Sequence, residues 1–349
     1  MKMSYNICFL GPDYKSSKGG ISSVIKIYTS LYSSSLFIPT TGGDSIYNKL
    51  FYFVKAIILL PLYVLFKGVN IIHIHGASNI SFYRKTIFIF LGKILGLRII
   101  FHIHGGGFKE FYNNGNSKFI HYVLKKCHLI IVLSDQWLQF FKEDLGIKNV
   151  KVLNNVIDYP DVKKEKTTSD KIQFLFLGHI YREKGIFDLI EVINENKNFY
   201  TENIRLHIGG GMFQTEALKI YLKENKLMNV IKFHGWVTGN EKNELLNSSD
   251  VFILPSYKEG VPISILEAMS YGLGVISTNV GGVPSIVLDY KNGILIEPGN
   301  KKMIKKSIDF FIENPKKARE YGVYGRKVVE GYYPGNIKKE LKRIYKEIL

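Results

Sequence analysis

The chain alternates from end to end between short apolar runs and longer segments with the periodicity of amphipathic helices. The apolar runs, such as VNIIHIH and LRIIFHIH, are rich in β-branched and aromatic residues, which favour strands. A helix is predicted over 20–31, after the first of these runs. Because the runs lack polar alternation, both faces of each strand must be buried, which is typical of a parallel sheet covered by helices. The sequence therefore predicts an α/β fold.

The alternation occurs in two series, separated by a polar stretch without periodicity at 158–171, which has the character of an interdomain linker. A chain of 349 residues also exceeds what one core usually fills. We expect two Rossmann-like domains with parallel sheets facing a central cleft, spanning 1–160 and 161–330. A C-terminal helix over 331–349 is expected to pack back toward the first domain.

The composition is that of a folded protein, with 46% hydrophobic and 22% charged residues. Its two cysteines, Cys8 and Cys127, lie in or beside apolar runs without the spacing of a disulfide framework or a metal site. A reducing, cytoplasmic compartment fits best. The N-terminal apolar run is too short for a secretory signal and is predicted to form the first buried strand.

The net charge of +17 is concentrated in the first half of the chain. Residues 1–160 hold 18 Lys and Arg against 7 Asp and Glu, while the remainder holds 29 against 23. The first half is therefore the candidate for contact with nucleic acid, an acidic membrane surface or a phosphorylated ligand.

The stretch EGVPISILEAMSYG carries two glutamates where a loop enters a helix, Glu259 at the end of a predicted strand and Glu267 within the helix. Backbone N–H groups of Ile263 and Ser264 at the helix start would form an anion site. A carboxylate accepts hydrogen bonds from neighbouring hydroxyls, so Glu267 is a candidate ribose ligand and Glu259 a candidate sugar ligand. Alternatively, both glutamates only complement the helix dipole, and the pattern alone does not decide between these readings.

The longer segment SYKEGVPISILEAMSYGLGVISTNVGGVPSIV resembles the donor-site signature of the retaining GT-B glycosyltransferases of family 4, the glycosyl transferases group 1, of the bacterial surface-polysaccharide type. The resemblance covers nearly the whole chain. It implies an acceptor domain at 1–160 and a nucleotide-sugar donor domain at 161–330, with Glu259 and Gly260 holding the sugar. The implied reaction is transfer of a hexosyl or N-acetylhexosaminyl group from a UDP-sugar with retention.

In FLGHIYREKGIFDLIEVI, which resembles the family's first donor-domain strand, loop and helix, Lys184 matches the lysine that holds the donor diphosphate. The family usually has Gly-Arg where this chain has Gly178 and His179. The second positive charge on the diphosphate is therefore missing, or is supplied by Arg182 or by a protonated His179.

Further landmarks resemble the family in order along the chain. Gly209 and Gly210, with Val237, match the loops that hold the nucleotide base, although three glycines after a strand more often form a turn. Gly19 and Gly20 match the N-terminal loop that lies over the donor diphosphate from the other side of the cleft.

Two histidine pairs end strands in the first half, His73 with His75 and His102 with His104. Metal binding is disfavoured, because two ligands on one strand do not close a zinc site and no acidic cluster lies nearby. By resemblance, His104 matches the cleft histidine that contacts the transferred sugar, whereas His73 and His102 are structural.

The resemblance makes Glu259, His104 and Lys184 the catalytic residues. Lys184 and the backbone amides would stabilise the leaving diphosphate without a metal, in keeping with the missing Asp-x-Asp motif, and no cofactor is implied. Retention would follow from front-face attack, in which the leaving phosphate accepts the proton of the acceptor.

Residues 51–66 form an apolar run with one lysine, too short for a comfortable membrane span and interrupted by Pro61. Either its outer face contacts an anionic membrane at the cytoplasmic face of the inner membrane, or the helix is buried by neighbours or by a dimer. The membrane reading makes a polyprenyl-diphosphate-linked glycan the expected acceptor.

Three other classes of function compete with this hypothesis. A sugar-nucleotide epimerase shares the fold, but the spacing of the two glutamates fits a transferase better. A nucleic-acid-binding protein would explain the charge, although no recognisable module is present and no nucleic-acid partner is expected. A nicotinamide-dependent oxidoreductase is weaker still, because neither half carries GxGxxG with a ribose-binding acid.

Overall fold

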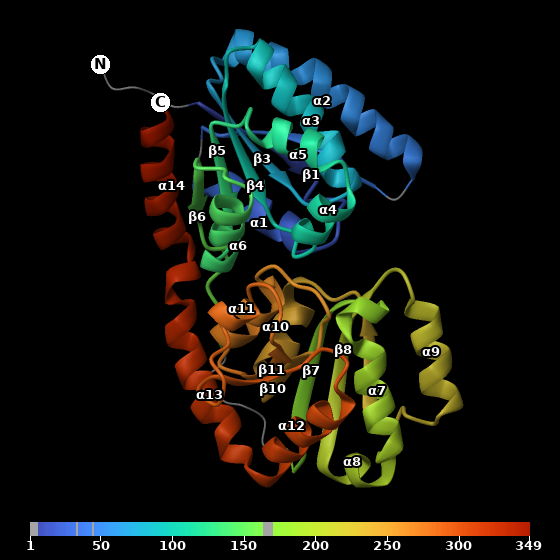
Figure 1. Ribbon diagram of the computed structural model, residues 1–349. Helices are drawn as coiled ribbons and strands as arrows, with labels where there is room; N and C mark the ends of the chain where they lie inside the picture. The colour runs from blue at the N-terminus through green and yellow to red at the C-terminus, as the bar shows by residue number, and fades with distance from the viewer. Residues whose placement is uncertain (1–5, 33, 44, 163–169) are drawn as a thin grey trace. The chain divides into compact units, whose positions relative to one another are not determined.

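The structure is a computed structural model, and it describes residues 6–32, 34–43, 45–162 and 170–349. The chain divides into two compact units (Figure 1). Unit 1 comprises Met1–Ile157 and Gly331–Leu349, and unit 2 comprises Asp158–Glu330. Part of the expected linker, 163–169, lies outside the described residues.

Unit 1 is built on a six-stranded sheet in which every strand pair is parallel. In sheet order the strands are β2 (Leu36–Thr41), β1 (Ile7–Pro12), β3 (Ile71–Gly76), β4 (Arg98–Ile103), β5 (Leu129–Val132) and β6 (Val150–Val152). The helices are α1 (Gly20–Leu31), α2 (Ile46–Lys67), α3 (Ile80–Ile94), α4 (Phe108–Asn114), α5 (Ser117–Leu124), α6 (Asp135–Gln139) and α14 (Pro334–Ile348). The helix expected over 20–31 is confirmed as α1.

The two faces of this sheet are covered by different helices. Ile72 and Ile74 of β3 pack in the core with residues of α2, α3 and α5. The alternate residues of β3, His73 and His75, face Tyr28 of α1, and His73 also bonds to α14. Side chains of a strand alternate between its faces, so this arrangement follows directly from the sequence of the run.

Unit 2 contains a second six-stranded sheet, again with every strand pair parallel. In sheet order the strands are β12 (Gly293–Ile296), β11 (Gly274–Thr278), β10 (Val251–Leu254), β7 (Ile172–His179), β8 (Ile204–Gly211) and β9 (Ile231–Gly235). The helices are α7 (Ile186–Glu195), α8 (Lys197–Asn203), α9 (Thr215–Glu224), α10 (Gly239–Ser248), α11 (Ile263–Ser270), α12 (Lys301–Glu313) and α13 (Pro315–Val328). Two parallel α/β sheets are therefore confirmed.

Helix α2 is longer than the apolar run from which it was expected. The Ser45 side chain accepts from the Asn48 backbone N–H at its start, and Gly68 with φ 61° ends it, giving 22 residues with Pro61 inside. Among the described helices, α2 alone is long and apolar enough to cross a membrane, by length and composition only. Only Ala56 and Leu60 of α2 are buried.

We expect the two sides of α2 to differ sharply in their contribution to stability. Leu60 is fully buried, so Leu60→Ala should lower the free energy of unfolding by about 2–5 kcal/mol by opening a cavity. Leu65 is 73% exposed, and Leu65→Ala should change it by less than about 0.5 kcal/mol. Urea unfolding followed by Trp137 fluorescence, in a Trp236→Phe background, measures unit 1 alone. Equal losses would show that the outer face of α2 is covered in solution.

Candidate active site

The strand order of unit 2 reverses between β7 and β10, which are neighbours in the sheet. In open parallel sheets, ligands bind beyond the carboxyl ends of the strands at such a switch point. Two segments leave the sheet there, the turn Arg182–Lys184 after β7 and the loop 255–262 after β10. Both segments carry residues that the sequence predicted to bind the donor.

Lys184 and Glu259 form a buried ion pair at this point. Lys184 Nζ donates to Glu259 Oε1 at 2.5 Å, and Ser256 Oγ donates to the same oxygen at 2.7 Å. The lysine and glutamate side chains are 17% and 8% exposed. Burial by itself lowers the pKa of Lys184, but the Glu259 carboxylate raises it above its ordinary value, so the ammonium stays charged. Ser256 was not predicted from the sequence.

Two glycines allow the backbone to approach closely around Glu259. A Cβ at Gly185 would lie 2.0 Å from the carbonyl oxygen of Pro255, and one at Gly281 would lie 1.8 Å from that of Glu259. Both glycines also have positive φ, 68° and 53°, which other residues rarely adopt. The loop after β10 is thus held by backbone contacts on two sides, which fixes the position of Glu259.

Helix α11 begins beside Glu259 and Gly260, with Pro262 as its N-cap residue. The first backbone bond of the helix runs from Leu266 N–H to the Pro262 carbonyl, so the N–H groups of Ile263 and Ser264 lie outside the helical ladder. Free N–H groups and the positive end of the helix dipole together suit an anion. The predicted anion site and the predicted sugar ligand are therefore adjacent in the chain.

Glu267, the predicted ribose ligand, lies in the second turn of α11 and forms an ion pair with Lys242 of α10. The Lys242 Nζ to Glu267 Oε1 distance is 2.6 Å, and the two side chains are 26% and 20% exposed. Sequence reasoning missed Lys242, because a lysine in the polar run GNEKNE has the pattern of a solvated residue.

The surroundings of His179 disfavour its charged form. Burial, and then the Lys184 ammonium, lower its pKa, although Glu259 acts in the opposite direction, so the imidazole is neutral at neutral pH. Its ring packs against Trp236 and Phe213, with centroid distances of 5.2 and 5.6 Å. Burial and the Lys184 ammonium thus both act against the alternative of a protonated His179.

Arg182 is the other candidate for the second charge, and it is exposed. Its guanidinium lies over the Phe187 ring, 5.8 Å from the centroid. Of the two predicted cationic ligands in this turn, Lys184 is therefore the one that is largely buried and paired with Glu259.

Close packing explains why glycines occur in the predicted base-binding loops. A Cβ at Gly210 would lie 2.0 Å from the carbonyl oxygen of Gly178, and one at Gly209 would meet Val237. The chain then passes through Met212 and Phe213, both with positive φ, of 67° and 46°. Two consecutive residues in this region are strained, which is a frequent feature of ligand-binding loops.

The remaining predicted site residues lie in unit 1. Gly19, with φ 128°, and Gly20 form the start of α1, in the segment that leaves the carboxyl end of β1. His104 follows β4, and its Nε2 lies 2.8 Å from Nδ1 of His75.

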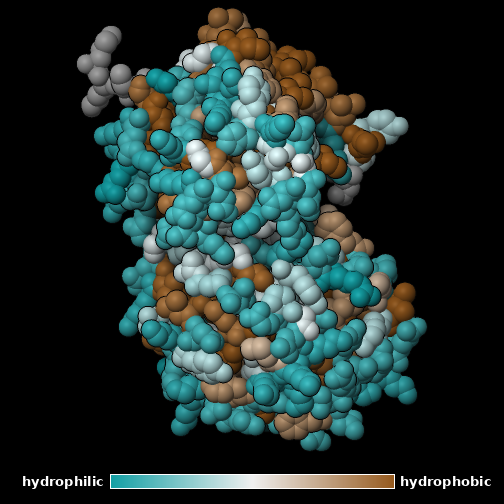
Figure 2. Space-filling model, viewed as in Figure 1, coloured by the Kyte–Doolittle hydropathy of each residue, from teal (hydrophilic) through white to brown (hydrophobic). Residues whose placement is uncertain are grey.

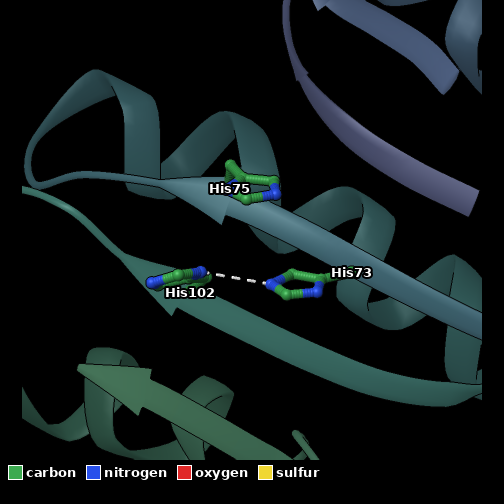
Figure 3. Close-up of side chains that lie close together, drawn as sticks. All are labelled: His73, His75 and His102. Carbon is green, nitrogen blue, oxygen red and sulfur yellow. Dashed lines mark hydrogen bonds between the residues drawn. The ribbon is translucent and has the colours of Figure 1, made fainter. Parts of the chain in front are cut away.

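The two histidine pairs meet on one face of the unit 1 sheet, because β3 and β4 are neighbours with His75 opposite His102. His73 Nε2 lies 3.2 Å from His102 Nδ1, as Figure 3 shows, and His73 Nδ1 lies 2.8 Å from the Tyr345 hydroxyl. Burial lowers the pKa of His73 and of His104 to about 3. His104 can therefore offer a hydrogen bond but no positive charge at neutral pH.

Three of these histidines, His73, His75 and His102, bring ligand atoms within 4.8 Å of one another. Sequence reasoning treated the pairs separately and did not expect this convergence. The His73 and His75 rings are stacked with an interplanar angle of 0° and centroids 4.6 Å apart, so their lone pairs lie in two parallel planes. In this arrangement the cluster is a buried hydrogen-bonded network whose members are held by Tyr345 and His104.

The chain as a whole has the GT-B architecture. Its structure resembles that of Anabaena HepE, solved in complex with UDP, with a TM-score of 0.78 and 16% identity, covering 98% of this chain and 100% of that one. Residues 159–328, which make up nearly all of unit 2, match the family described as glycosyl transferases group 1. The chain belongs to this family, glycosyltransferase family 4.

Two relatives show how far the similarity extends in sequence. An uncharacterised glycosyltransferase of Methanocaldococcus jannaschii is 26% identical over 291 residues, covering 78% of this chain and 73% of that protein. The capsular polysaccharide biosynthesis glycosyltransferase CapM of Staphylococcus aureus is 27% identical over 194 residues, covering 54% of this chain and 49% of CapM. The chain thus matches about half the length of CapM.

The neutral state of His179 gives a prediction about diphosphate affinity. His179→Arg restores a fixed charge beside Lys184 and should tighten the binding of UDP about tenfold, the effect of one charge-assisted hydrogen bond. His179→Gln, which replaces one neutral group by another, should change the affinity by less than about threefold. Calorimetric titration at pH 7.5 measures both. A large loss of affinity in the glutamine variant would mean that the imidazole acts as a cation.

Proposed function

We propose that this protein is a retaining glycosyltransferase that moves a sugar from a nucleoside-diphosphate donor, a UDP-sugar, to a polyprenyl-diphosphate-linked glycan in surface-polysaccharide synthesis. The observation that carries the proposal is the buried Lys184–Glu259 pair at the switch point, beside the N-terminus of α11. UDP in the HepE complex supports the choice of donor, and the capsular function named for CapM supports the choice of pathway.

Charge develops at two places during the reaction, and the site offers a group for each. As the bond between the anomeric carbon and the diphosphate oxygen breaks, negative charge grows on the diphosphate, where Lys184 and the N–H groups of Ile263 and Ser264 stabilise it. The Lys184 ammonium has three N–H groups that can donate hydrogen bonds. It can therefore bind the diphosphate while it stays bonded to Glu259, or it can leave Glu259 for the diphosphate. Glu259 then accepts hydrogen bonds from sugar hydroxyls.

Retention follows if the acceptor attacks from the face that the diphosphate leaves. The acceptor oxygen bonds to the anomeric carbon, and its proton passes to the departing diphosphate oxygen, so no separate base is needed. His104, whose pKa is lowered to about 3 by burial, is neutral and would not act as a proton donor at neutral pH. Glu259 is committed to Lys184 and Ser256, which favours a positioning role over that of a nucleophile.

The reaction is tested with a panel of UDP-, GDP- and ADP-sugars, without and with a synthetic polyprenyl-diphosphate sugar. One donor should release nucleoside diphosphate, faster with the lipid, and the product should keep the donor's anomeric configuration. Glu259→Gln and Lys184→Met should each lower kcat/KM about 100-fold or more. A C4 or C2 epimer as the product would point instead to an epimerase, and no turnover with any donor would refute the proposal.

Loss of folding must be separated from loss of chemistry, because removing one partner of a buried pair destabilises by about 3–5 kcal/mol. The double variant Lys184→Met/Glu259→Gln leaves no unpaired charge and should regain stability while remaining inactive. Lys301, paired with Glu191 between α12 and α7, is the matched control in the same unit. Lys301→Met should keep kcat/KM within about twofold.

We further propose that unit 1 docks on the anionic cytoplasmic leaflet of the inner membrane through the outer face of α2. This face carries the following exposed apolar residues: Ile46, Tyr47, Leu50, Phe51, Val54, Ile58, Leu62, Leu65 and Phe66. Figure 2 shows a largely brown surface over this helix. Lys49, Lys55 and Lys67 are exposed on the same helix and suit anionic headgroups.

Vesicle sedimentation tests this surface. Wild type should bind vesicles containing phosphatidylglycerol more strongly than pure phosphatidylcholine, and Phe51→Glu/Leu65→Glu should reduce binding at least about tenfold by placing charge in the apolar layer. Ile220→Glu on α9 of unit 2, also at an exposed apolar residue, is the control and should bind normally. Membrane docking would be contradicted if the double variant bound vesicles as well as wild type. It would also be contradicted if the double variant changed from dimer to monomer, because α2 would then be covered by a second copy of the chain.

A further inference from the structure

The Lys242–Glu267 pair joins two helices that are distant in sequence. Lys242 is the fourth residue of α10 and Glu267 the fifth residue of α11, and each side chain is about three-quarters buried or more. A cation near the N-terminus of a helix is opposed by the helix dipole. Lys242 therefore occupies a position that its own helix disfavours, and the pair with Glu267 offsets this.

Helix α10 also connects the pair to the predicted base-binding loop. The helix begins at Gly239, directly after the loop that contains Trp236 and Val237. Glu267 is carried by α11, whose N-terminus provides the predicted diphosphate amides. One contact between side chains thus links the segment assigned to the base with the segment assigned to the diphosphate.

The hydrogen-bonding capacity of Glu267 leaves room for a ligand beside Lys242. A carboxylate has about four lone-pair positions on its two oxygens. Lys242 occupies one position on Oε1. Two vicinal hydroxyls can fill two of the others, so Lys242 need not leave when a ribose binds. The ammonium, held 2.6 Å from Oε1, also fixes the direction in which the carboxylate points.

We propose that Lys242 is a positioning residue that holds Glu267 oriented for the 2′- and 3′-hydroxyls of a ribonucleoside diphosphate. The proposal rests on the proposed function and specifies its substrate class: donors built on ribose rather than 2′-deoxyribose. Lys242 acts through Glu267 and not on the reacting atoms. Its removal should therefore change the affinity for the nucleoside more than the rate at saturating donor.

The experiment compares the binding of UDP and 2′-deoxy-UDP by calorimetry in wild type, Lys242→Met, Lys242→Arg and Glu267→Gln. Wild type should prefer UDP at least about tenfold, the worth of one hydrogen bond to a charged group. Lys242→Met and Glu267→Gln should bring the two affinities within about threefold, and Lys242→Arg should restore most of the preference. With the active donor, Lys242→Met should raise KM more than it lowers kcat.

The ratio of the two affinities separates this role from a structural one. If Lys242 only joins α10 to α11, Lys242→Met lowers the Tm but leaves the preference for ribose unchanged, and the proposal is wrong. Lys301→Met, which breaks another ion pair between helices of the same unit, should leave the ratio at the wild-type value. Absence of any nucleoside diphosphate binding by the wild type would refute the proposed function, whereas UDP binding without ribose preference refutes only the role of Lys242.

Discussion

The ion pair between Lys184 and Glu259 is the interaction around which unit 2 is arranged. Two charges with side chains 17% and 8% exposed lose much of their hydration, and such a pair adds little stability compared with apolar residues. The surrounding chain is nevertheless adapted to hold it: glycine at 185 and 281 admits carbonyl groups at distances that no Cβ tolerates, and Ser256 orients the carboxylate. A costly pair held this firmly is best explained by chemistry that needs both charges in place.

Much of the fold could be predicted from the sequence, but the contacts that form the site could not. Continuous apolar runs specify parallel strands because both faces must be buried, and α1 has the predicted bounds. The meeting of Lys184 with Glu259, 75 residues later, depends on β7 and β10 being neighbours, which periodicity does not encode. Lys242 was missed for another reason: its neighbours in sequence are those of a solvated helix, whereas its partner Glu267 lies 25 residues later in α11.

Unit 1 shares the architecture of unit 2 but distributes its polar groups differently. One face of its sheet buries His73, His75 and His102 as neutral groups, a network that His104 extends to the strand end. On the other face, α2 buries Ala56 and Leu60 fully and packs partly buried residues such as Phe53 against the core, while its outer apolar residues stay exposed. The apolar run of 16 residues in the sequence is shorter than α2, which has 22 residues. The helix is longer because the caps at Ser45 and Gly68, and not the apolar run, set where it begins and ends.

The neutral His179 bears on how the proposed reaction would gain its rate. In the proposed reaction, one buried ammonium and the helix N–H groups would meet the diphosphate, without the second positive charge that the family resemblance led us to expect. Backbone N–H groups at a helix N-terminus and a preorganised lysine interact most strongly with the negative charge that develops on the diphosphate as the glycosidic bond breaks. Binding energy that appears in the transition state raises kcat, whereas a second cation would also stabilise the bound diphosphate before and after transfer. A site with one fixed cation is therefore consistent with an enzyme that must release its nucleoside diphosphate product after every transfer.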